Sequence, residues 1–484
     1  MNGPIRRLAV MLFAGFAMLL FAVTWFQVVR ADELKTDPRN PRPALADRGK
    51  ERGLIVSIEG TVLARSVPDP ADPRNFVRQY PEGPAFAHVV GYSSFLVGAS
   101  GLEAEYSSQL RSRRDLTISD LVAVILGQDL RPRSVEVTLD PALQRLAYDA
   151  LGENRGAVVA MDPRTGAILV SVSKPSFDPT LLNALDAAEQ WDRLLQDPTR
   201  PLDDRATRQI YPPGSTFKTV VAAAGLDTGK VTPATEFADP AEFQLPGSTA
   251  TISNFDGDAC NNGETATLLQ AFVRSCNTIF ADLAIQLGAT DIGITAAALG
   301  FNRDLEFEWN VPQAIFPVGE LDDDPAALGQ SGIGERNVRA SPLHMAMVAA
   351  AVANEGMVPS PFLMQRVVDA NGEMVDSTDP ESMRAMSTET AATLTQLMER
   401  VVTEGTGRRA AVPGVRVAGK TGTATGQGGF PNTWFIGFAP VANPQIALAV
   451  FIEGTPVSGE TATGGSTAAP IAARLIENWV DRQP

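Results

Sequence analysis

Strand-forming segments in the larger part of this chain fall into two groups separated by a long helical region. Two apolar runs flank the turn at 162–166, whose proline and glycine are the signal of a β-hairpin. Helical patterns dominate from about 215 to 402, and strand patterns return only near the carboxyl end. Strands from both ends with helices inserted between them predict an α+β fold, an antiparallel five-stranded sheet packed against helices and an all-helical lobe. The segments are strands at 157–161, 167–172, 415–418, 432–438 and 446–452, and a closing helix at 467–479.

An uncharged apolar run occupies residues 8–29, after a short amino-terminal segment, residues 1–7, that carries Arg6 and Arg7. The run is long enough to cross a bilayer, whereas the apolar part of a signal peptide is typically about 7–15 residues. We therefore expect an uncleaved single-pass anchor in the cell membrane, with a cleaved signal peptide as the alternative. The arginine pair favours a cytoplasmic amino terminus, although Arg30 blurs the charge asymmetry. Everything after residue 30 is then expected outside the cell.

Between the anchor and the larger domain we expect a tether and a small folded region. Residues 30–52 form the linker, and its proline-rich stretch at 37–43 cannot hold a regular helix. Residues 53–135 contain short β-like runs at 54–58 and 86–90, which predict a small α+β accessory domain.

An amphipathic helix at 140–151 opens the larger domain, residues 136–484, because Asp140 and Pro141 suit its cap and first turn. A chain of 484 residues exceeds what one hydrophobic core usually organises, which agrees with several units.

Charge and histidine content exclude several classes of function. A formal charge of −16 repels phosphate backbones, so nucleic acid is not an expected partner. The 2 histidines, His88 and His344, lie in unlike settings, which argues against a His-rich zinc site and against a Ser-His-Asp triad. We expect no metal and no cofactor, and we expect His344 to serve packing in an alanine-rich helix.

The segment 211–225 places a serine and a lysine at the start of a buried helix. Two prolines and a glycine precede Ser215, and the residues after it are apolar nearly all round. Lys218 lies one helical turn after Ser215, so the two side chains share a face. Burial lowers the pKa of a lysine, and the neutral amine can then take the proton of a serine hydroxyl. The alternative is that Ser215 only caps the helix and Lys218 reaches the solvent.

Two later motifs strengthen the catalytic interpretation of Ser215 and Lys218. Ser275-Cys276-Asn277 lies at a junction between two helical patterns, where both polar residues could simply be caps. Lys420-Thr421-Gly422-Thr423 follows a strand and brings a cation, hydroxyls and a glycine that admits a substrate backbone. Three such motifs in this order are hard to explain as independent caps, and we expect them to meet in a cleft between sheet and helical lobe.

Ser-x-x-Lys, Ser-x-Asn and Lys-Thr-Gly in this order resemble the signatures of penicillin-binding proteins and serine β-lactamases. The resemblance covers about residues 140–484 and extends to the neighbouring sequences at 211–214, 341–343 and 432–435. Within the family the chain is most similar to monofunctional class B-like D,D-transpeptidases, and especially to the actinobacterial penicillin-binding protein A group. Motifs at 51–55 and 101–103 also resemble the accessory region of class B proteins, and 404–407 resembles a turn that precedes the Lys-Thr-Gly strand.

The resemblance implies a serine acyl-enzyme. Ser215 attacks the penultimate D-alanine carbonyl of a D-Ala-D-Ala stem peptide, Lys218 is the general base, and Ser275 relays a proton to the leaving amine. The remaining motif residues bind substrate: Asn277 bonds its backbone, Lys420 and Thr421 recognise its carboxylate together with Gly422 and Thr423, and the amides of Ser215 and Thr423 form the oxyanion hole.

Cys260 and Cys276 are the 2 cysteines of the chain. An even pair in an oxidising compartment predicts a disulfide, which would tie the loop before Ser275 to the middle of its motif. Two buried thiols are the alternative.

The resemblance thus implies a peptidoglycan D,D-transpeptidase of cell wall synthesis and cell division that β-lactams acylate and inhibit. Expected partners are stem peptides and a glycan polymerase or divisome protein. A D,D-carboxypeptidase, in which water accepts the acyl group, is the near alternative, and a catalytically silent scaffold is the distant one. The intact motifs argue against the scaffold.

Overall fold

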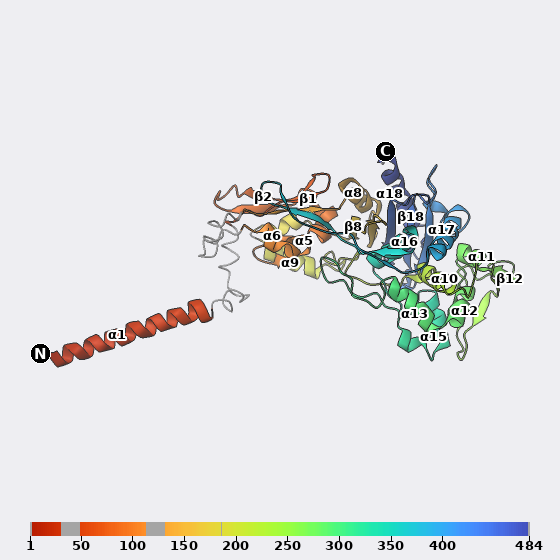
Figure 1. Ribbon diagram of the computed structural model, residues 1–484, viewed down its shortest axis with the longest axis horizontal. Coiled ribbons are helices and arrows are strands. Elements are labelled where there is room, and N and C mark those ends of the chain that lie inside the picture. The colour runs from red at the N-terminus through yellow and green to blue at the C-terminus, as the bar shows by residue number, and fades with distance from the viewer. Residues whose placement is uncertain (1, 31–48, 113–130, 185, 483–484) are drawn as a thin grey trace. The chain divides into compact units, whose positions relative to one another are not determined.

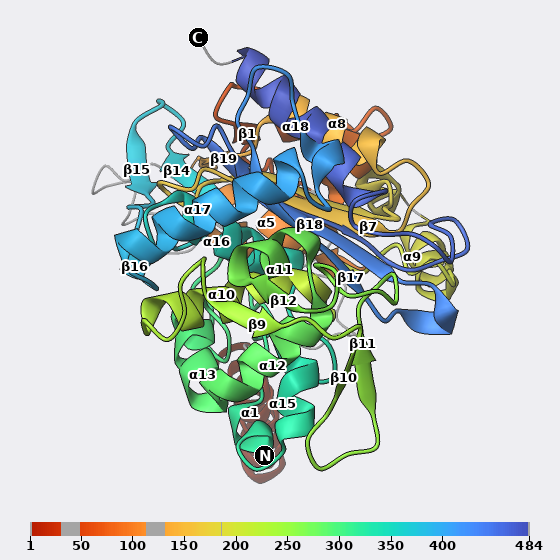
Figure 2. The ribbon, with the colours of Figure 1, turned by 90° about the vertical axis from the view of Figure 1, so that its right-hand side faces the viewer.

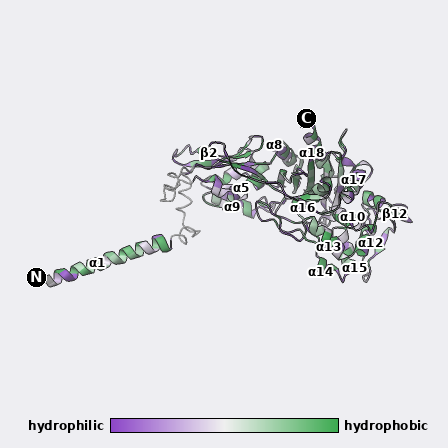
Figure 3. Ribbon diagram, in the orientation of Figure 1, coloured by the Kyte–Doolittle hydropathy of each residue, from purple (hydrophilic) through white to green (hydrophobic). Residues whose placement is uncertain are grey.

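The computed structural model describes residues 2–30, 49–112, 131–184 and 186–482. Contacts divide the chain into two units, one of residues 1–51 and 67–77 and the other of residues 52–66 and 78–484. The first unit contains helix α1 (Asn2–Thr24), which continues as a π-helical turn, η1 (Trp25–Val29). Together they form an apolar helix with mean hydropathy 2.3 over its most apolar window, long and apolar enough to cross a membrane (Figures 1 and 3). The predicted tether at 37–43 lies outside the described residues.

A six-stranded sheet in the order β15-β14-β6-β1-β2-β3 draws its strands from distant parts of the sequence. β1 and β6 pair in parallel, with Ile55 opposite Val135, while β14 pairs antiparallel to β6, with Val367 opposite Val135. The sheet therefore crosses the predicted boundary between residues 135 and 136. Its strands are β1 (Ile55–Ser57), β2 (Val62–Pro68), β3 (Phe76–Gln79), β6 (Ser134–Val137), β14 (Met364–Val368) and β15 (Met374–Ser377).

The predicted strand at 86–90 was wrong. These residues follow a 3₁₀ turn, η2 (Gly83–Phe86), and form a short helix, α4 (Ala87–Val90). Pro84 suits the first turn of a helix, and Gly91 ends it with a φ of 76°. An apolar run this short does not distinguish a buried strand from a buried helix. The other elements of this region are β4 (Ser93–Ser94), β5 (Gly98–Ala99), α5 (Gly101–Glu105), α6 (Ser107–Leu110) and α9 (Ala187–Gln196).

A buried charge cluster joins the two segments whose sequences resemble the class B accessory region. Glu103 of α5 is fully buried and forms ion pairs with both Arg52 and Arg78. The hydroxyl of Tyr80 also donates to Glu103, and Arg78 Nη1 donates to the carbonyl of Gly53 at 2.7 Å. Burial alone would raise the pKa of Glu103, but the two guanidinium groups hold it below its ordinary value. The cluster therefore connects α5 to the start of β1.

The antiparallel five-stranded sheet predicted from the sequence is present, in the order β17-β18-β19-β7-β8. Alternate residues of β7 enter two separate cores: Val158 packs with α8 and α18, and Val159 packs on the side of α16. This alternation covers both faces of the sheet with helices (Figure 2). The elements are α8 (Pro141–Ala150), β7 (Gly156–Met161), β8 (Ile168–Lys174), β17 (Ala418–Ala424), β18 (Asn432–Ala439), β19 (Ile446–Ile452) and α18 (Ala468–Arg482).

One strand boundary differs from its prediction. The strand expected at 415–418 lies at Ala418–Ala424 instead, so the Lys-Thr-Gly motif is inside the strand rather than after it. Glycines and charged residues are uncommon in strands, so the sequence pattern did not indicate a strand over these residues. Lys420 pairs with Ile436 of the apolar strand β18, and this pairing imposes the extended conformation.

The helical lobe is present but contains more strands than predicted. His344 is buried in α16, where its ring approaches Phe301 and Nδ1 lies 2.7 Å from Ser341 Oγ. Its role in packing agrees with the prediction. The helices are α10 (Lys218–Asp227), α11 (Leu268–Arg274), α12 (Asn277–Leu287), α13 (Ala289–Ala298), α14 (Val318–Leu321), α15 (Pro325–Gly332), α16 (Pro342–Ala353) and α17 (Thr388–Thr403). The short strands between them are β9 (Glu236–Ala238), β10 (Glu242–Gln244), β11 (Thr251–Ser253), β12 (Thr265–Thr267), β13 (Met357–Pro359) and β16 (Ser382–Arg384).

Candidate active site

Ser215 lies in a 3₁₀ turn, η4 (Gly214–Phe217), that leads directly into α10. Gly214 has a φ of 52°, and its amide donates to the carbonyl of Gly334 at 3.0 Å. A side chain at this position would also collide with the carbonyl of Thr423, since a Cβ there would lie 2.6 Å from it. The turn thus brings the Ser215 backbone beside Thr423, the two residues whose amides the resemblance assigns to an oxyanion hole.

Lys218 is fully buried at the start of α10. Its Nζ donates to the carbonyl of Ser275 at 2.6 Å and to Asn277 Oδ1 at 2.7 Å. Burial, reinforced by the nearby charge of Lys420, holds the pKa of Lys218 well below its ordinary value. A neutral amine has two N–H bonds, and the two short hydrogen bonds use both. Its lone pair is then free to accept a proton.

Ser275 joins the two lysines of the site. It ends α11 with a φ of 64°, in the left-handed region that only a small share of residues other than glycine adopt. In this conformation Ser275 Oγ lies 2.8 Å from Lys420 Nζ and 3.4 Å from Lys218 Nζ. A strained backbone that brings a hydroxyl between two amines is the kind of feature that is retained at functional sites.

Lys420 is also fully buried, on β17. Its Nζ donates to the carbonyl of Thr421 at 3.1 Å as well as to Ser275 Oγ. Burial lowers the pKa of Lys420 to about 7. Near neutral pH this side chain is therefore divided between its charged and neutral forms.

Asn277 and its surroundings fix the floor of the site. Asn254, which follows β11, accepts hydrogen bonds from the amides of Asn277 and Thr278 at 2.7 and 3.2 Å. No sequence pattern indicates Asn254, because its role depends on a contact between two separate segments of the chain. The disulfide predicted between Cys260 and Cys276 is present, with a Cα–Cα distance of 6.1 Å, and it holds the loop after Asn254 against the Ser275 motif.

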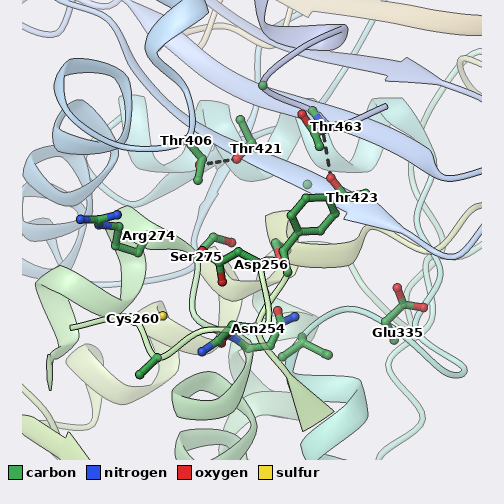
Figure 4. A pocket seen from close by; sticks show the side chains of 18 residues that line it. Asn254, Asp256, Cys260, Arg274, Ser275, Glu335, Thr406, Thr421, Thr423 and Thr463 are labelled. Carbon is green, nitrogen blue, oxygen red and sulfur yellow. Dashed lines mark hydrogen bonds between the residues drawn. The ribbon is translucent and has the colours of Figure 1, made fainter. Parts of the chain in front are cut away.

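A cavity of about 390 Å³ opens over these residues (Figure 4). Six of the residues predicted to act in catalysis or substrate binding line it, and Lys218 and Lys420 lie buried behind Ser275. Among the described residues, no group of three or more metal-binding side chains occurs. The predicted residues in the lining are Ser215, Ser275, Asn277, Thr421, Gly422 and Thr423, and those that sequence reasoning missed include Asn254, Phe255, Asp256, Glu335, Thr406 and Thr463.

A nucleophile turn, a buried lysine pair and a serine between them on a sheet-and-helix scaffold define the class of the protein as a serine acyltransferase of the penicillin-binding type. The family model described as penicillin binding protein transpeptidase domain matches residues 156–477, and the model described as penicillin binding protein A dimerisation domain matches residues 52–135. The chain belongs to the penicillin-binding protein transpeptidase family.

Two curated relatives are similar over their whole length. The peptidoglycan D,D-transpeptidase PbpA of Mycolicibacterium smegmatis is 39% identical, with 98% of each chain covered. The protein of the same name from Mycobacterium tuberculosis is 37% identical, with 100% of each chain covered. These matches confirm the predicted resemblance to the penicillin-binding protein A group.

Solved structures agree in fold. Penicillin-binding protein A from M. tuberculosis, solved as its ceftriaxone acyl-enzyme complex, superposes with a TM-score of 0.82 at 35% identity, covering 90% of this chain and 99% of that one. PBP2 of Pseudomonas aeruginosa superposes with a TM-score of 0.74 at 30% identity, covering 88% of this chain and 96% of that one. The predicted fold class is confirmed.

Proposed function

We propose that this chain is a membrane-anchored peptidoglycan D,D-transpeptidase that cross-links stem peptides through an acyl-enzyme on Ser215. The observation that carries the proposal is the contact of Ser275 with both buried lysines beside the cavity that Ser215 lines. The names of the curated relatives and the β-lactam complex of a solved relative support the same activity.

Acylation begins with Ser215. Its Oγ attacks the carbonyl carbon of the penultimate D-alanine while the hydroxyl proton passes to the neutral amine of Lys218. The amides of Ser215 and Thr423 stabilise the negative oxygen of the tetrahedral intermediate. Because Lys218 is fully buried, the proton moves to an amine that is shielded from bulk water.

Expulsion of the terminal D-alanine requires a proton on its nitrogen. Ser275 gives its hydroxyl proton to that nitrogen as the C–N bond breaks, and it regains a proton from Lys218 across the 3.4 Å contact. Terminal D-alanine leaves, and the serine ester remains. The amine of a second stem peptide then attacks the ester carbonyl, and Ser275 accepts the amine proton while passing its own proton to Lys218. Lys218 returns a proton to Ser215 Oγ as the ester C–O bond breaks and the cross-link forms.

The other motif residues orient the substrate. Asn277 bonds the peptide backbone. Thr421 bonds the terminal carboxylate, which the positive charge of Lys420 attracts from behind Ser275. Gly422 and Thr423 form the strand edge beside it. Penicillin and related β-lactams acylate Ser215 by the same attack and block the site.

In this proposal the rest of the chain holds the catalytic domain at the membrane. Residues 8–29 anchor the protein with its amino terminus in the cytoplasm, and residues 136–484 carry catalysis outside the cell. Residues 53–135 form the accessory domain, which is suited to contact a glycan polymerase or divisome protein. Arg6 and Arg7 before the apolar helix support this orientation.

The test is covalent labelling followed by product analysis. Fluorescent penicillin should label the detergent-solubilised full-length protein and the control Ser248→Ala, and Ser215→Ala should abolish the label. Wild-type protein supplied with a D-Ala-D-Ala stem peptide and an amine acceptor should then yield cross-linked product by mass spectrometry.

Two other outcomes would contradict parts of this assignment. Release of D-alanine to give only the trimmed peptide would identify a D,D-carboxypeptidase. Absence of any label on the wild-type protein would overturn the enzyme and leave a scaffold.

A further inference from the structure

Two threonine hydroxyls meet at one wall of the active-site cavity, and the mechanism above uses only one of them. Thr406 Oγ1 lies 2.5 Å from Thr421 Oγ1, and both residues line the cavity (Figure 4). Thr421 belongs to β17, where it is 5% exposed. Thr406 belongs to the turn after α17, within the segment 404–407 whose sequence resembles a turn that precedes the Lys-Thr-Gly strand.

The turn holds Thr406 in a fixed place. The carbonyl of Val401 accepts hydrogen bonds from the amides of Gly405 and Gly407, at 3.1 and 3.0 Å, so the backbone on each side of Thr406 is tied to the last turn of α17. A Cβ added to Gly465 would lie 2.4 Å from the carbonyl of Thr406, so a second segment closes against it. The hydroxyl of Thr406 is therefore delivered by a packed turn, although the residue itself is exposed to the cavity.

The protons of these two hydroxyls favour an anionic ligand at this wall of the cavity. Two hydroxyls carry two protons, and their mutual hydrogen bond uses one. Within the described part of the chain, neither oxygen has another hydrogen-bond partner. The second proton is thus available to an acceptor in the cavity. Lys420 Nζ donates to the carbonyl of Thr421, so a cation lies at the same point of β17.

We propose that Thr406 is a positioning residue for the terminal carboxylate of the substrate. Its hydroxyl donates to Thr421 Oγ1, and this bond directs the Thr421 proton toward the carboxylate. The proposal rests on the proposed function, since it assigns a residue to the recognition of that substrate. Without the Thr406 hydroxyl, the Thr421 hydroxyl can rotate among its staggered positions and no longer presents its proton in one direction.

The experiment compares penicillin G with its methyl ester, which lacks the carboxylate. Acylation of the full-length protein is measured by stopped-flow fluorescence and resolved into the dissociation constant of the first complex and the rate constant of acylation. In Thr406→Val, which keeps the side-chain shape, we expect the complex with penicillin G to weaken about threefold, because the Thr421 hydroxyl is then divided among its three staggered positions. The acylation rate constant, and both constants for the ester, should stay unchanged.

Two variants serve as controls. Thr406→Ser retains the hydroxyl and should restore binding of penicillin G. Thr403→Val removes a hydroxyl from the same helix end, where it contacts only the carbonyl of Arg400, and should leave both ligands unaffected.

Three results with a reactive wild-type protein would overturn the role of Thr406 alone: equal losses for acid and ester, a loss confined to the acylation rate constant, or no loss at all. A wild-type protein that neither ligand acylates would instead overturn the proposed function on which the inference rests.

Discussion

Lys218 and Lys420 share Ser275, and their common contact makes their protonation states interdependent. Burial lowers the pKa of each lysine, and the charge of Lys420 lowers the pKa of Lys218 further. Two ammonium groups at one serine are therefore disfavoured, and the stable arrangement has one charged and one neutral amine. This asymmetry supplies a base for Ser215 and a cation for the substrate carboxylate without any acidic partner.

The pKa of Lys420, about 7, predicts how acylation depends on pH. Below this value Lys420 is charged and binds a carboxylate, and above it the charge is lost. We expect kcat/KM for acylation by penicillin G to fall about tenfold per pH unit on the alkaline side of neutrality, as one proton is lost. Lys420→Arg keeps the charge and should move this decline beyond pH 9, whereas the uncharged methyl ester should show no decline in either protein.

Stopped-flow acylation between pH 5 and 10 measures these profiles. An alkaline limb that is the same for the acid and the ester would contradict the assignment to Lys420. The sequence motifs were sufficient to select both lysines. They could not indicate that Ser275 adopts a left-handed conformation, because that conformation is imposed by the junction of α11 and α12.

At the scale of elements, the loop between β11 and β12 is fixed at both ends. Asn254 binds the first amides of α12, and Cys260 is bonded to Cys276. Phe255 and Asp256 between these points line the cavity, and Phe255 is 74% exposed. The loop thus forms a wall of the site. It is attached to the Ser275-Cys276-Asn277 motif, which also contacts the two lysines.

Removing the disulfide should destabilise the protein more than it slows the chemistry. The sequence separation of 16 residues corresponds to about 3 kcal/mol of lost stability in the chain-entropy treatment. We expect the Cys260→Ala/Cys276→Ala double variant to lose about that free energy in urea unfolding. A reductant should lower the stability of the wild type and leave the double variant unaffected; an equal effect on both would contradict the prediction.

Element boundaries show what the sequence could and could not predict. The apolar strand β19 was predicted at its observed ends because its apolar run is bounded by turn residues, Asn443-Pro444 before it and Gly454 after it. β17 was missed by several residues, since Lys420, Gly419 and Gly422 have weak strand preferences and acquire extended structure only through pairing with β18.

At the scale of the whole molecule, the Glu103 cluster links the first strand of the six-stranded sheet to its helices. Glu103→Gln leaves the buried guanidinium of Arg78 and the partly buried guanidinium of Arg52 without a countercharge, and breaking a buried ion pair costs about 3–5 kcal/mol. We expect thermal unfolding to show this loss, whereas Glu105→Gln on the exposed side of α5 should behave as the wild type. An unchanged melting temperature for Glu103→Gln would contradict the prediction.

The assignment of distant chain segments to the same sheet was the feature hardest to predict from the sequence. Residues 357–384 looked like part of a helical lobe, yet β14 and β15 return to the sheet that begins at β1. The local sequence of these strands does not identify the strands with which they pair, because a pairing between segments so far apart depends on tertiary packing.

The return of β14 to this sheet has a consequence for the order in which its strands pair during synthesis. Val135 pairs with Val367, so the ribosome must release most of the chain before β14 can pair with β6. Contacts of such long range form late, because the entropy of closing the intervening loop has to be met first. One edge of β6 therefore stays unpaired until β14, synthesised more than 200 residues later, has emerged.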